Sequence, residues 1–317
     1  MRATPTGTLE GFRVGLNTII WLLFYKYRLR TPLNRITEAL KEQYQLKLTE
    51  GAIQHILHHL KKRFGTKYQQ IVKTIKKAPV KHGDETSWRV EGINNWCWLF
   101  ASQKAALYTI EETRGKAVPI TVLGKDPSGI LVRDDYAAYQ HLPMEQQSCW
   151  AHLLRFSREK SKQEKTSKEA RVLHTELKTI FQELKDSTEQ SFKQRRRDKV
   201  YQYYLKQLIQ IQKRTYHSPD AKAVQTRIKN QGANLITALK YDDVPLTNNH
   251  AERQIRPMVV TRKISGGSRS PEGAATHAVN MSITQTIFLE GKAFFSGMKQ
   301  LLKPKTWQYV MESTGKN

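Results

Sequence analysis

The sequence predicts an α/β protein in which a helical N-terminal region precedes strands that are followed by a long helical segment. Apolar residues recur at helical spacing through the first 65 residues. From residue 84 they alternate with polar residues, and from about residue 155 the helical spacing returns. Because helices and half-buried strands have different hydrophobic periods, each change marks a boundary. We therefore predict four regions, at residues 1–75, 76–155, 156–240 and 241–317.

The first region is predicted to contain three short helices. Thr31-Pro32 supplies an N-cap followed by a proline, and Thr49 is an N-cap for the next helix. Gly65 stands where that helix would end. A tight turn between the last two helices fits a helix-turn-helix, a pattern that any packed three-helix unit shares. The side chains on the outward face after Thr49 that suit base edges and phosphates are Gln54, His55, His58 and Lys61.

The second region carries the predicted strands. Alternation of polar and apolar residues begins at Asp84 and predicts a strand there. The next expected strands, at residues 96–101 and 105–110, complete an antiparallel meander. After a connection of helical character, the apolar run 129–132 is typical of a central strand buried on both faces. This strand ends on Asp134.

The third region is predicted to be a helical insertion. It is rich in Lys, Gln and Glu, and apolar residues at helical spacing lie on both sides of the run Arg195-Arg196-Arg197. A face that lies along DNA and a solvated helical face both fit this charge pattern. The fourth region is also predicted to be helical, with a glycine-rich break at Gly266-Gly267.

Basic residues dominate the charge of the chain. Lys and Arg number 53 against 28 Asp and Glu, which gives a formal net charge of +25. Solubility needs far less, so a polyanionic partner is expected, nucleic acid first. A solvated basic surface with no specific partner is the alternative.

The cysteines and the hydropathy of the chain indicate the cellular compartment in which it works. The two cysteines, Cys97 and Cys149, form no Cys-x-x-Cys pair, which favours a reducing interior and excludes a cysteine-rich zinc finger. The apolar run at residues 15–25 falls short of the ~20 residues that span a bilayer. We therefore expect a cytoplasmic, nucleoid-associated protein without membrane contact.

Three acids come from separate predicted elements: Asp84 opens a strand, Asp134 ends another, and Glu252 enters from a helix. Two divalent metals ~4 Å apart can activate the nucleophile and stabilise the leaving oxygen in phosphodiester cleavage. Mg²⁺ prefers carboxylate oxygens, so acids that converge would suit it. A right-handed crossover would set the two strands parallel and adjacent. The alternatives are strand-end polarity for the aspartates and a capping box with Asn249 for Glu252.

Four blocks of sequence carry a resemblance to a known family. They read GDETSWRV at 83–90, ILVRDDYAAY at 130–139, CWAHLLR at 149–155 and NNHAER at 248–253, the last continuing through Arg256-Pro257 to RKISGGS at 262–268. In this order they resemble the insertion-sequence-66 transposase family over roughly residues 30–300. Together they are far more specific than any one motif.

The resemblance implies a transposase of the DDE type, with a ribonuclease-H-like catalytic core that follows the helix-turn-helix and is interrupted by the helical insertion. Asp84, Asp134 and Glu252 would be the metal-binding triad, holding two Mg²⁺ ions for which Mn²⁺ can substitute. The implied reaction is cleavage of DNA strands at transposon ends and their transfer to target DNA. A homo-oligomer assembled on DNA is expected.

Further site residues follow from the same blocks. Cys149 and His152 match a Cys-x-x-His spacing found between the second and third acids of many DDE enzymes, so His152 is expected beside the metals, steadying the scissile phosphate. A packed strand-to-helix junction is the alternative. The basic residues after the third acid that suit phosphate clamping are Arg253, Arg256, Arg262 and Lys263.

Neighbouring acids are predicted to lie outside the triad. Glu85 and Asp135 each follow a triad acid, and period-two geometry points them to the other face of the sheet. Asp242 and Asp243 precede Pro245 in a loop outside the matched blocks.

Two rival functions remain open: a DNA-binding remnant without catalysis, and a ribonuclease-H-like nuclease that cuts without joining. Members of the family usually carry a longer N-terminal region with a coiled coil and a cysteine zinc finger. The chain is therefore expected to be an N-terminally short member, as a compact variant, a fragment or a remnant.

Overall fold

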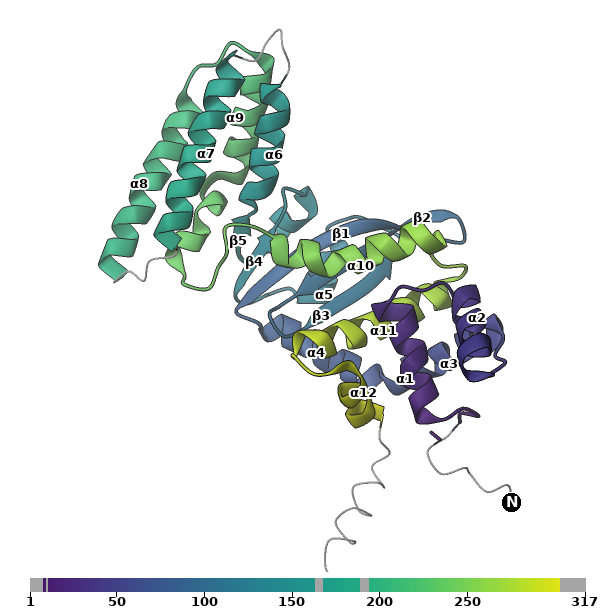
Figure 1. The fold of residues 1–317 in the computed structure, drawn as a ribbon. Helices are drawn as coiled ribbons and strands as arrows, with labels where there is room; N and C mark the ends of the chain where they lie inside the picture. The colour runs from purple at the N-terminus through teal and green to yellow at the C-terminus, as the bar shows by residue number, and fades with distance from the viewer. Residues whose placement is uncertain (1–7, 10, 163–167, 189–193, 303–317) are drawn as a thin grey trace, which may run out of the picture. The chain divides into compact units, whose positions relative to one another are not determined.

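Figure 1 shows the computed structural model of the chain, in which residues 8–9, 11–162, 168–188 and 194–302 are described. The chain divides into two units. Helices and a sheet are both present, so the predicted α/β class is confirmed. Unit 1 comprises Met1–Ile75, Glu85–Thr113 and Gln254–Asn317, and unit 2 comprises Lys76–Asp84 and Arg114–Arg253.

Helices flank the strands of unit 1. The N-terminal set is α1 (Leu16–Leu23), a π-helical turn (Phe24–Arg28), α2 (Leu33–Tyr44), α3 (Glu50–Arg63) and α4 (Gly65–Lys77), and the C-terminal pair is α11 (Pro271–Leu289) and α12 (Phe294–Leu302). The predicted cap of α3 is confirmed. The hydroxyl of Thr49 accepts a hydrogen bond of 3.1 Å from the amide of Ala52, which satisfies one of the first-turn donors that a helix leaves unpaired.

Two predicted helix ends in this unit are wrong. α2 begins at Leu33 with Pro32 in the cap position, and no side chain caps it, so Thr31 is not its N-cap. Gly65 does not end a helix but opens α4. Phe64 closes α3, and its carbonyl accepts a bond of 2.8 Å from the amide of Tyr68, so the chain turns directly into the next helix. A fourth helix therefore follows the three that the sequence predicts.

A five-stranded mixed sheet has the strand order β3-β2-β1-β4-β5. Its strands are β1 (Val80–Val90), β2 (Ile93–Ala101), β3 (Ala106–Glu111), β4 (Ile130–Arg133) and β5 (Glu145–Ser148). β2 and β3 pair antiparallel, and β4 pairs parallel with both β1 and β5. The predicted meander strands and the buried apolar strand are thus confirmed. β5 was not predicted, because its sequence, EQQS, does not alternate between apolar and polar residues.

β1 begins at Val80, earlier than predicted, so Asp84 lies within the strand and not at its start. The early part is hard to read from sequence because Lys81 and His82 are charged or polar and yet buried. The ammonium of Lys81 donates hydrogen bonds of 2.5 Å to the carbonyls of Ala78 and Ser128, which replaces the water that it loses.

Polar residues of α11 protect strand β3, which lies at the edge of the sheet. The hydroxyl of Ser282 accepts a bond of 2.9 Å from the amide of Tyr108, and that of Thr286 accepts one of 3.1 Å from Ala106. An exposed strand edge presents unpaired amides that can pair with a strand of another chain. α11 therefore covers this edge, which explains why its buried face contains so many hydroxyls.

Unit 2 contains the helices that the sequence predicts between the second and third acids. α6 (Trp150–Ser161), α7 (Lys168–Thr188), α8 (Gln194–Lys213) and α9 (Pro219–Gln231) lie side by side in Figure 1. Their inner faces share one apolar core that also includes Val132 of β4. The prediction of a helical segment is confirmed, but α6 begins at Trp150, before residue 156, since Trp150 and Leu153 pack into the same core.

Two further α-helices and three short 3-10 helices (Ala137–His141, Gly232–Leu235 and Thr237–Lys240) complete the described chain. α5 (Ala117–Leu123) is the predicted helical connection, and α10 (Asn249–Ser265) begins in unit 2 and continues into unit 1. The break at Gly266-Gly267 separates α10 from α11, as predicted. Throughout the described ranges, no helix is long and apolar enough to cross a membrane.

Candidate functional site

The strands that carry the two predicted aspartates are neighbours in unit 2. β1 and β4 run parallel, and their register pairs Val80 with Ile130 and His82 with Val132. Asp84 and Asp134 each lie two residues beyond the last of these pairs, Asp84 within β1 and Asp134 directly after β4. Both aspartates are partly buried. The parallel, adjacent arrangement expected from the sequence is therefore present.

The start of α6 is tied to the end of β4. The amide of Cys149, in the cap position of α6, donates a bond of 2.9 Å to the carbonyl of Arg133, the residue before Asp134. His152 lies in the first turn of this helix. Its position relative to Asp134 is therefore set by a main-chain hydrogen bond.

The start of α10 is tied to both α6 and β1. The amide of Asn248 donates a bond of 3.1 Å to the Sγ atom of Cys149. The side-chain amide of Asn248 donates a bond of 2.7 Å to the carbonyl of Gly83, and its Oδ1 lies 3.1 Å from Nδ1 of His82. Asn248 is completely buried, so these bonds are shielded from competing water. They join the residue before Asp84 to the helix that carries Glu252.

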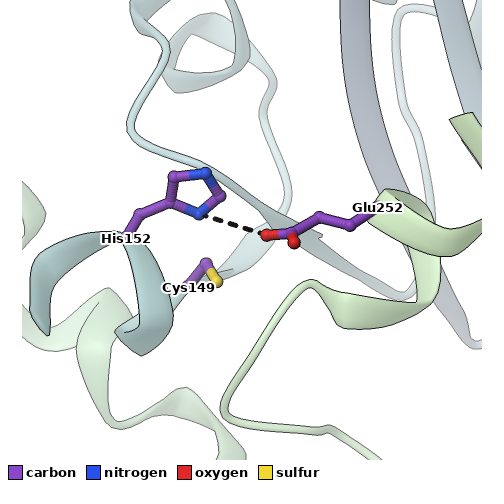
Figure 2. Close-up of side chains that lie close together, drawn as sticks. All are labelled: Cys149, His152 and Glu252. Atoms are coloured by element: carbon purple, nitrogen blue, oxygen red, sulfur yellow. Dashed lines mark ion pairs between the residues drawn. The ribbon is translucent and has the colours of Figure 1, made fainter. Parts of the chain in front are cut away.

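The side chains of Cys149, His152 and Glu252 gather in unit 2, as Figure 2 shows. One ligand atom from each lies within 4.8 Å of the others. Nδ1 of His152 lies 3.7 Å from Oε1 of Glu252, and both atoms are buried without a hydrogen-bond partner. Buried polar atoms are rarely left unpaired, so two such atoms facing each other indicate a place for a cation or another polar ligand.

The cluster of Cys149, His152 and Glu252 is the one group in the described part of the chain whose His, Cys, Asp and Glu side chains are close enough to hold a metal ion. Asp84 and Asp134 lie outside it. The observed geometry thus brings His152 to Glu252, and it brings the strands of Asp84 and Asp134 together.

Cys149 behaves as a structural member of this cluster. Its side chain is completely buried, and its sulfur already accepts the amide hydrogen of Asn248. Burial raises the pKa of its thiol, and the hydrogen bond from the amide of Asn248 opposes that shift only in part. The packed strand-to-helix junction of the alternative is present, because Cys149 is buried there. His152 faces Glu252, and its place beside metal ions stays a prediction.

The capping-box alternative for Glu252 does not fit the structure. The amide of Glu252 donates a bond of 3.1 Å to the carbonyl of Asn248, so Asn248 occupies the cap position and Glu252 lies one residue too far along for a capping box. Its Oε1 makes no hydrogen bond. The carboxylate is therefore available to a ligand.

Residues of α9 hold the segment around Asp134. The guanidinium of Arg227 forms an ion pair with Asp135, and that of Arg133 donates a bond of 2.6 Å to Oε1 of Gln231. Oδ1 of Asp134 accepts a bond of 3.0 Å from the amide of Tyr136, which fixes the turn that follows β4. Helix α9 thus contacts both residues next to Asp134, Arg133 and Asp135, within unit 2.

The other acids considered from sequence have separate roles or surroundings. Asp242 pairs with Arg197, and Asp243 is exposed. Glu85 is partly buried in β1. Whether Glu85 and Asp135 point away from the triad stays a prediction.

The predicted DNA-contacting face of α3 is partly occupied by contacts within unit 1. Nδ1 of His58 lies 3.0 Å from Oε1 of Glu272, and the ammonium of Lys61 lies 2.5 Å from the same oxygen. The pKa of Glu272 is lowered, first by its hydrogen bond from Lys61. His55 is exposed, and Gln54 lines a groove described below. The ring of His58 and the ammonium of Lys61 are therefore not wholly free to contact phosphates.

The predicted clamp residues of α10 also differ from one another. Arg253, Arg256 and Lys263 are exposed. Arg262 instead donates hydrogen bonds to Oγ1 of Thr86 at 3.1 Å and to the carbonyl of Ser87 at 2.6 Å. Arg262 thus braces β1 within unit 1, a structural role that its sequence position does not reveal.

Sequence reasoning missed His82, Asn248 and His250. The rings of His82 and His250 have centroids 4.8 Å apart, and burial followed by the charge of His250 lowers the pKa of His82 to about 4. One signal was available: His82 lies two positions before Asp84 and so shares its side of the strand. Asn248 gave no signal, because only the folded chain brings it to Gly83.

Comparison with known proteins agrees with the sequence blocks. No match was found among the curated proteins. The family model described as "Transposase IS66 family" matches residues 11–276, a span that includes Asp84, Asp134, His152 and Glu252. The chain therefore belongs to the IS66 family of transposases.

Proposed function

We propose that this chain is a DDE transposase that catalyses metal-dependent cleavage and transfer of DNA strands, with Asp84, Asp134 and Glu252 as the metal-binding triad. Family membership supplies the transposase role. The chemistry is supported by one observation in unit 2: the elements that bear these acids are hydrogen-bonded to one another beside each acid.

Two hydrogen bonds tie these elements together beside Asp84 and Asp134. Gly83, next to Asp84, accepts a bond from Asn248, whose carbonyl begins the helix of Glu252. Arg133, next to Asp134, accepts a bond from Cys149, which caps the helix of His152. Acids held by such main-chain contacts are pre-organised, so little ordering is needed when ligands bind.

The residues present fit hard divalent cations. Glu252 offers a buried carboxylate oxygen that makes no hydrogen bond and lies 3.7 Å from Nδ1 of His152, and Asp84 and Asp134 offer carboxylates from adjacent strands. Such oxygens are the ligands that Mg²⁺ and Mn²⁺ prefer. When bound between these acids, two ions would activate the attacking oxygen and stabilise the leaving one. Zn²⁺ fits less well, because the sulfur of Cys149 is already engaged by Asn248.

The residues of the chain position the reacting groups. His152, with its Nδ1 turned toward Glu252, steadies the scissile phosphate. In the first step a water oxygen attacks the phosphorus, and the 3′-oxygen leaves and takes up a proton. In the second step that 3′-hydroxyl attacks a phosphorus of target DNA and displaces another 3′-oxygen, so one phosphodiester forms as one breaks.

Three further features belong to this proposal. The five-stranded sheet with its acids is a ribonuclease-H-like core, and α6 to α9 are its insertion. The helices up to α4 act as a helix-turn-helix unit, with DNA contacts from Gln54 and His55 and from the exposed Arg253, Arg256 and Lys263. Transfer needs two DNA segments in one assembly, so a homo-oligomer on DNA is the working form.

The decisive experiment uses supercoiled plasmid and a pre-cleaved oligonucleotide with a free 3′-hydroxyl. The purified chain is incubated with each, with Mg²⁺, with Mn²⁺ and with a chelator. Nicking that needs the metal, together with joining of the oligonucleotide to plasmid, is the expected result. Nicking without joining would favour the nuclease, and DNA binding without cleavage in a protein shown to bind Mn²⁺ would favour the remnant.

A further inference from the structure

An open groove in unit 1 is framed by the N-terminal ends of three helices. Its volume is about 610 Å³, and its walls include Leu33 at the start of α2, Gly51 in the first turn of α3, and Gly273 in the first turn of α11. All three helices exceed eight residues. The groove is separate from the candidate metal site, which lies in unit 2.

Convergence of helix starts makes the groove electropositive. Each helix carries a partial charge of roughly +0.5 at its N-terminus, and its first-turn amides lack partners within the helix. Caps from Thr49 and Ser270 engage the amides of Ala52 and Gly273, and Pro271 at the start of α11 has no N–H. The earlier donors of these turns are therefore the amides of Glu50 and Gly51 in α3 and of Glu272 in α11. Gly51 has no side chain to cover its main chain, which is therefore open to the groove.

The charged side chains of the groove are two cations and one acid. Lys26 and Arg269 line it, and so does the exposed Glu50 in the first turn of α3. Burial lowers the pKa of Lys26, while the charge of Glu50 opposes that shift. Glu50 offsets only one of the two positive charges, so a bound anion would neutralise the other.

His277 supplies an independent sign of a ligand. This residue of α11 lines the groove, is 7% exposed, and its Nε2 is buried without a hydrogen-bond partner. Its ring is held by packing against Trp88, with centroids 5.2 Å apart, and against Tyr27, with centroids 5.1 Å apart. Burial, followed by the charge of Lys26, lowers its pKa to about 3, so the ring is neutral near pH 7. In the Nε2–H tautomer it is a hydrogen-bond donor that lacks an acceptor.

We propose that this groove is a second DNA contact, in which a backbone phosphate binds the first-turn amides of α3 and α11, Arg269 and Nε2 of His277. The ligand class follows from the donors: amides at helix starts, a guanidinium and an imidazole N–H all suit a phosphate oxygen. The choice of DNA as the source of that phosphate rests on the proposed function. The contact extends the outward face of α3, with which it shares Gln54, because it adds α11 and the loop before it.

The sharpest test adds one negative charge in the groove without harming the fold. Gly51→Asp places an acid at the second position of α3, where acids stabilise a helix and where an added Cβ meets little. Thr66→Asp is the matched control, because Thr66 is exposed and occupies the second position of α4, outside the groove. Binding to a fluorescent DNA duplex is measured in chelator, so no cleavage intervenes.

We expect Gly51→Asp to weaken DNA binding about tenfold and Thr66→Asp to change it by less than about twofold, with melting temperatures no lower than wild type. Arg269→Ala should reduce the slope of log Kd against log salt by about 0.9, the value of one lost phosphate contact. Lys73→Ala, at an exposed position of α4, should leave that slope unchanged.

The role of His277 is tested with two variants, one that keeps the shape of the ring and one that keeps a hydrogen-bond donor. His277→Phe preserves stacking on Trp88 but removes Nε2, and should weaken binding severalfold. His277→Gln, whose amide nitrogen can replace Nε2, should recover part of the affinity. Wild-type affinity in Gly51→Asp, Arg269→Ala and His277→Phe would overturn the proposal, provided that each is folded.

A free anion would be a different ligand for the same donors. Binding of inorganic phosphate alone is therefore measured by calorimetry. Micromolar binding that Arg269→Ala abolishes, without any effect of that variant on duplex binding, would overturn the assignment to DNA. Failure of the proposed catalysis is seen separately, since cleavage by wild type depends on metal and the groove is probed without it.

Discussion

The side-chain amide of Asn248 donates a hydrogen bond of 2.7 Å to the carbonyl of Gly83, so the residue that begins α10 is fastened to the residue before Asp84. This bond links two parts of the chain that are 165 residues apart. Together with the contact of Asn248 with His82, it holds the helix of the third acid beside the strand of the first. Asn248 is therefore a positioning residue for the proposed metal site.

Removing this bond should impair catalysis more than folding. Asn248→Ala is expected to lower metal-dependent nicking by about 10- to 100-fold, because partners that orient metal ligands have effects of that size. Raised Mn²⁺ should restore part of the activity, which a merely structural role would not predict. Asn249→Ala, at the exposed next position, is the control. Equal nicking by both variants across the Mn²⁺ range would refute the positioning role.

Each triad acid should be indispensable for cleavage. Asp84→Ala, Asp134→Ala and Glu252→Ala are expected to reduce plasmid nicking to background while DNA binding in chelator stays near wild type. Asp243→Ala, at an exposed acid of the same unit, should cleave normally. Normal cleavage by any triad variant would remove that residue from the site. Glu85→Ala should be much milder, and severe loss there would show that the assigned strand face is wrong.

The ion pair of Arg227 and Asp135 should contribute to stability and not to metal binding. Side-chain exposures of 25% and 14% place it well inside unit 2, so Asp135→Ala is expected to cost about 1–3 kcal/mol of unfolding free energy. The exposed pair Arg35 and Glu38, with exposures of 66% and 59%, should be worth less than about 0.5 kcal/mol. Urea unfolding of single and double variants measures both couplings. Similar small couplings for the two pairs would contradict the structure.

Two adjacent glycines should respond differently to a methyl group. Both Gly266 and Gly267 have positive φ, at 74° and 127°. At Gly267 an added Cβ would also overlap the carbonyl of Arg89, whereas at Gly266 it would meet nothing within 4 Å. Gly266→Ala should therefore cost about 1 kcal/mol, and Gly267→Ala substantially more. Thermal melting of the two variants measures these costs. Equal losses of stability would show that the main chain at Arg89 moves aside easily.

His277 should make the stability of the chain depend on pH. Its pKa is about 3 in the folded chain and about 6.5 when unfolded, so the unfolded state binds more protons between these values. The stabilisation is complete above about pH 6.5 and falls by about 1.4 kcal/mol for each pH unit below it. His277→Phe cannot titrate and should lose less stability than wild type between about pH 6 and 4. Parallel losses in urea unfolding would contradict the burial of a neutral imidazole.

Much of the architecture could be predicted from local patterns. The helical N-terminal region, the meander, the buried strand before Asp134 and the helical segment follow from hydrophobic periodicity, which depends only on neighbouring residues. The predicted helix end at Gly65 was wrong because a glycine can also begin a helix when the preceding turn closes on Phe64. β5 could not be predicted, because its polar residues are stabilised by partners such as Thr237 and Leu235, which lie far along the chain.

The sequence by itself determined the family, the α/β class and the identity of the candidate acids, since these depend on residue type, spacing and order. Only the tertiary structure decided that His152 faces Glu252, that Asn248 fastens α10 to β1, and that three helix starts meet beside His277. The physical reason is the same in each case. A hydrogen bond or an electrostatic contact depends on distance in space, and segments far apart in the chain acquire that distance only when their apolar faces pack.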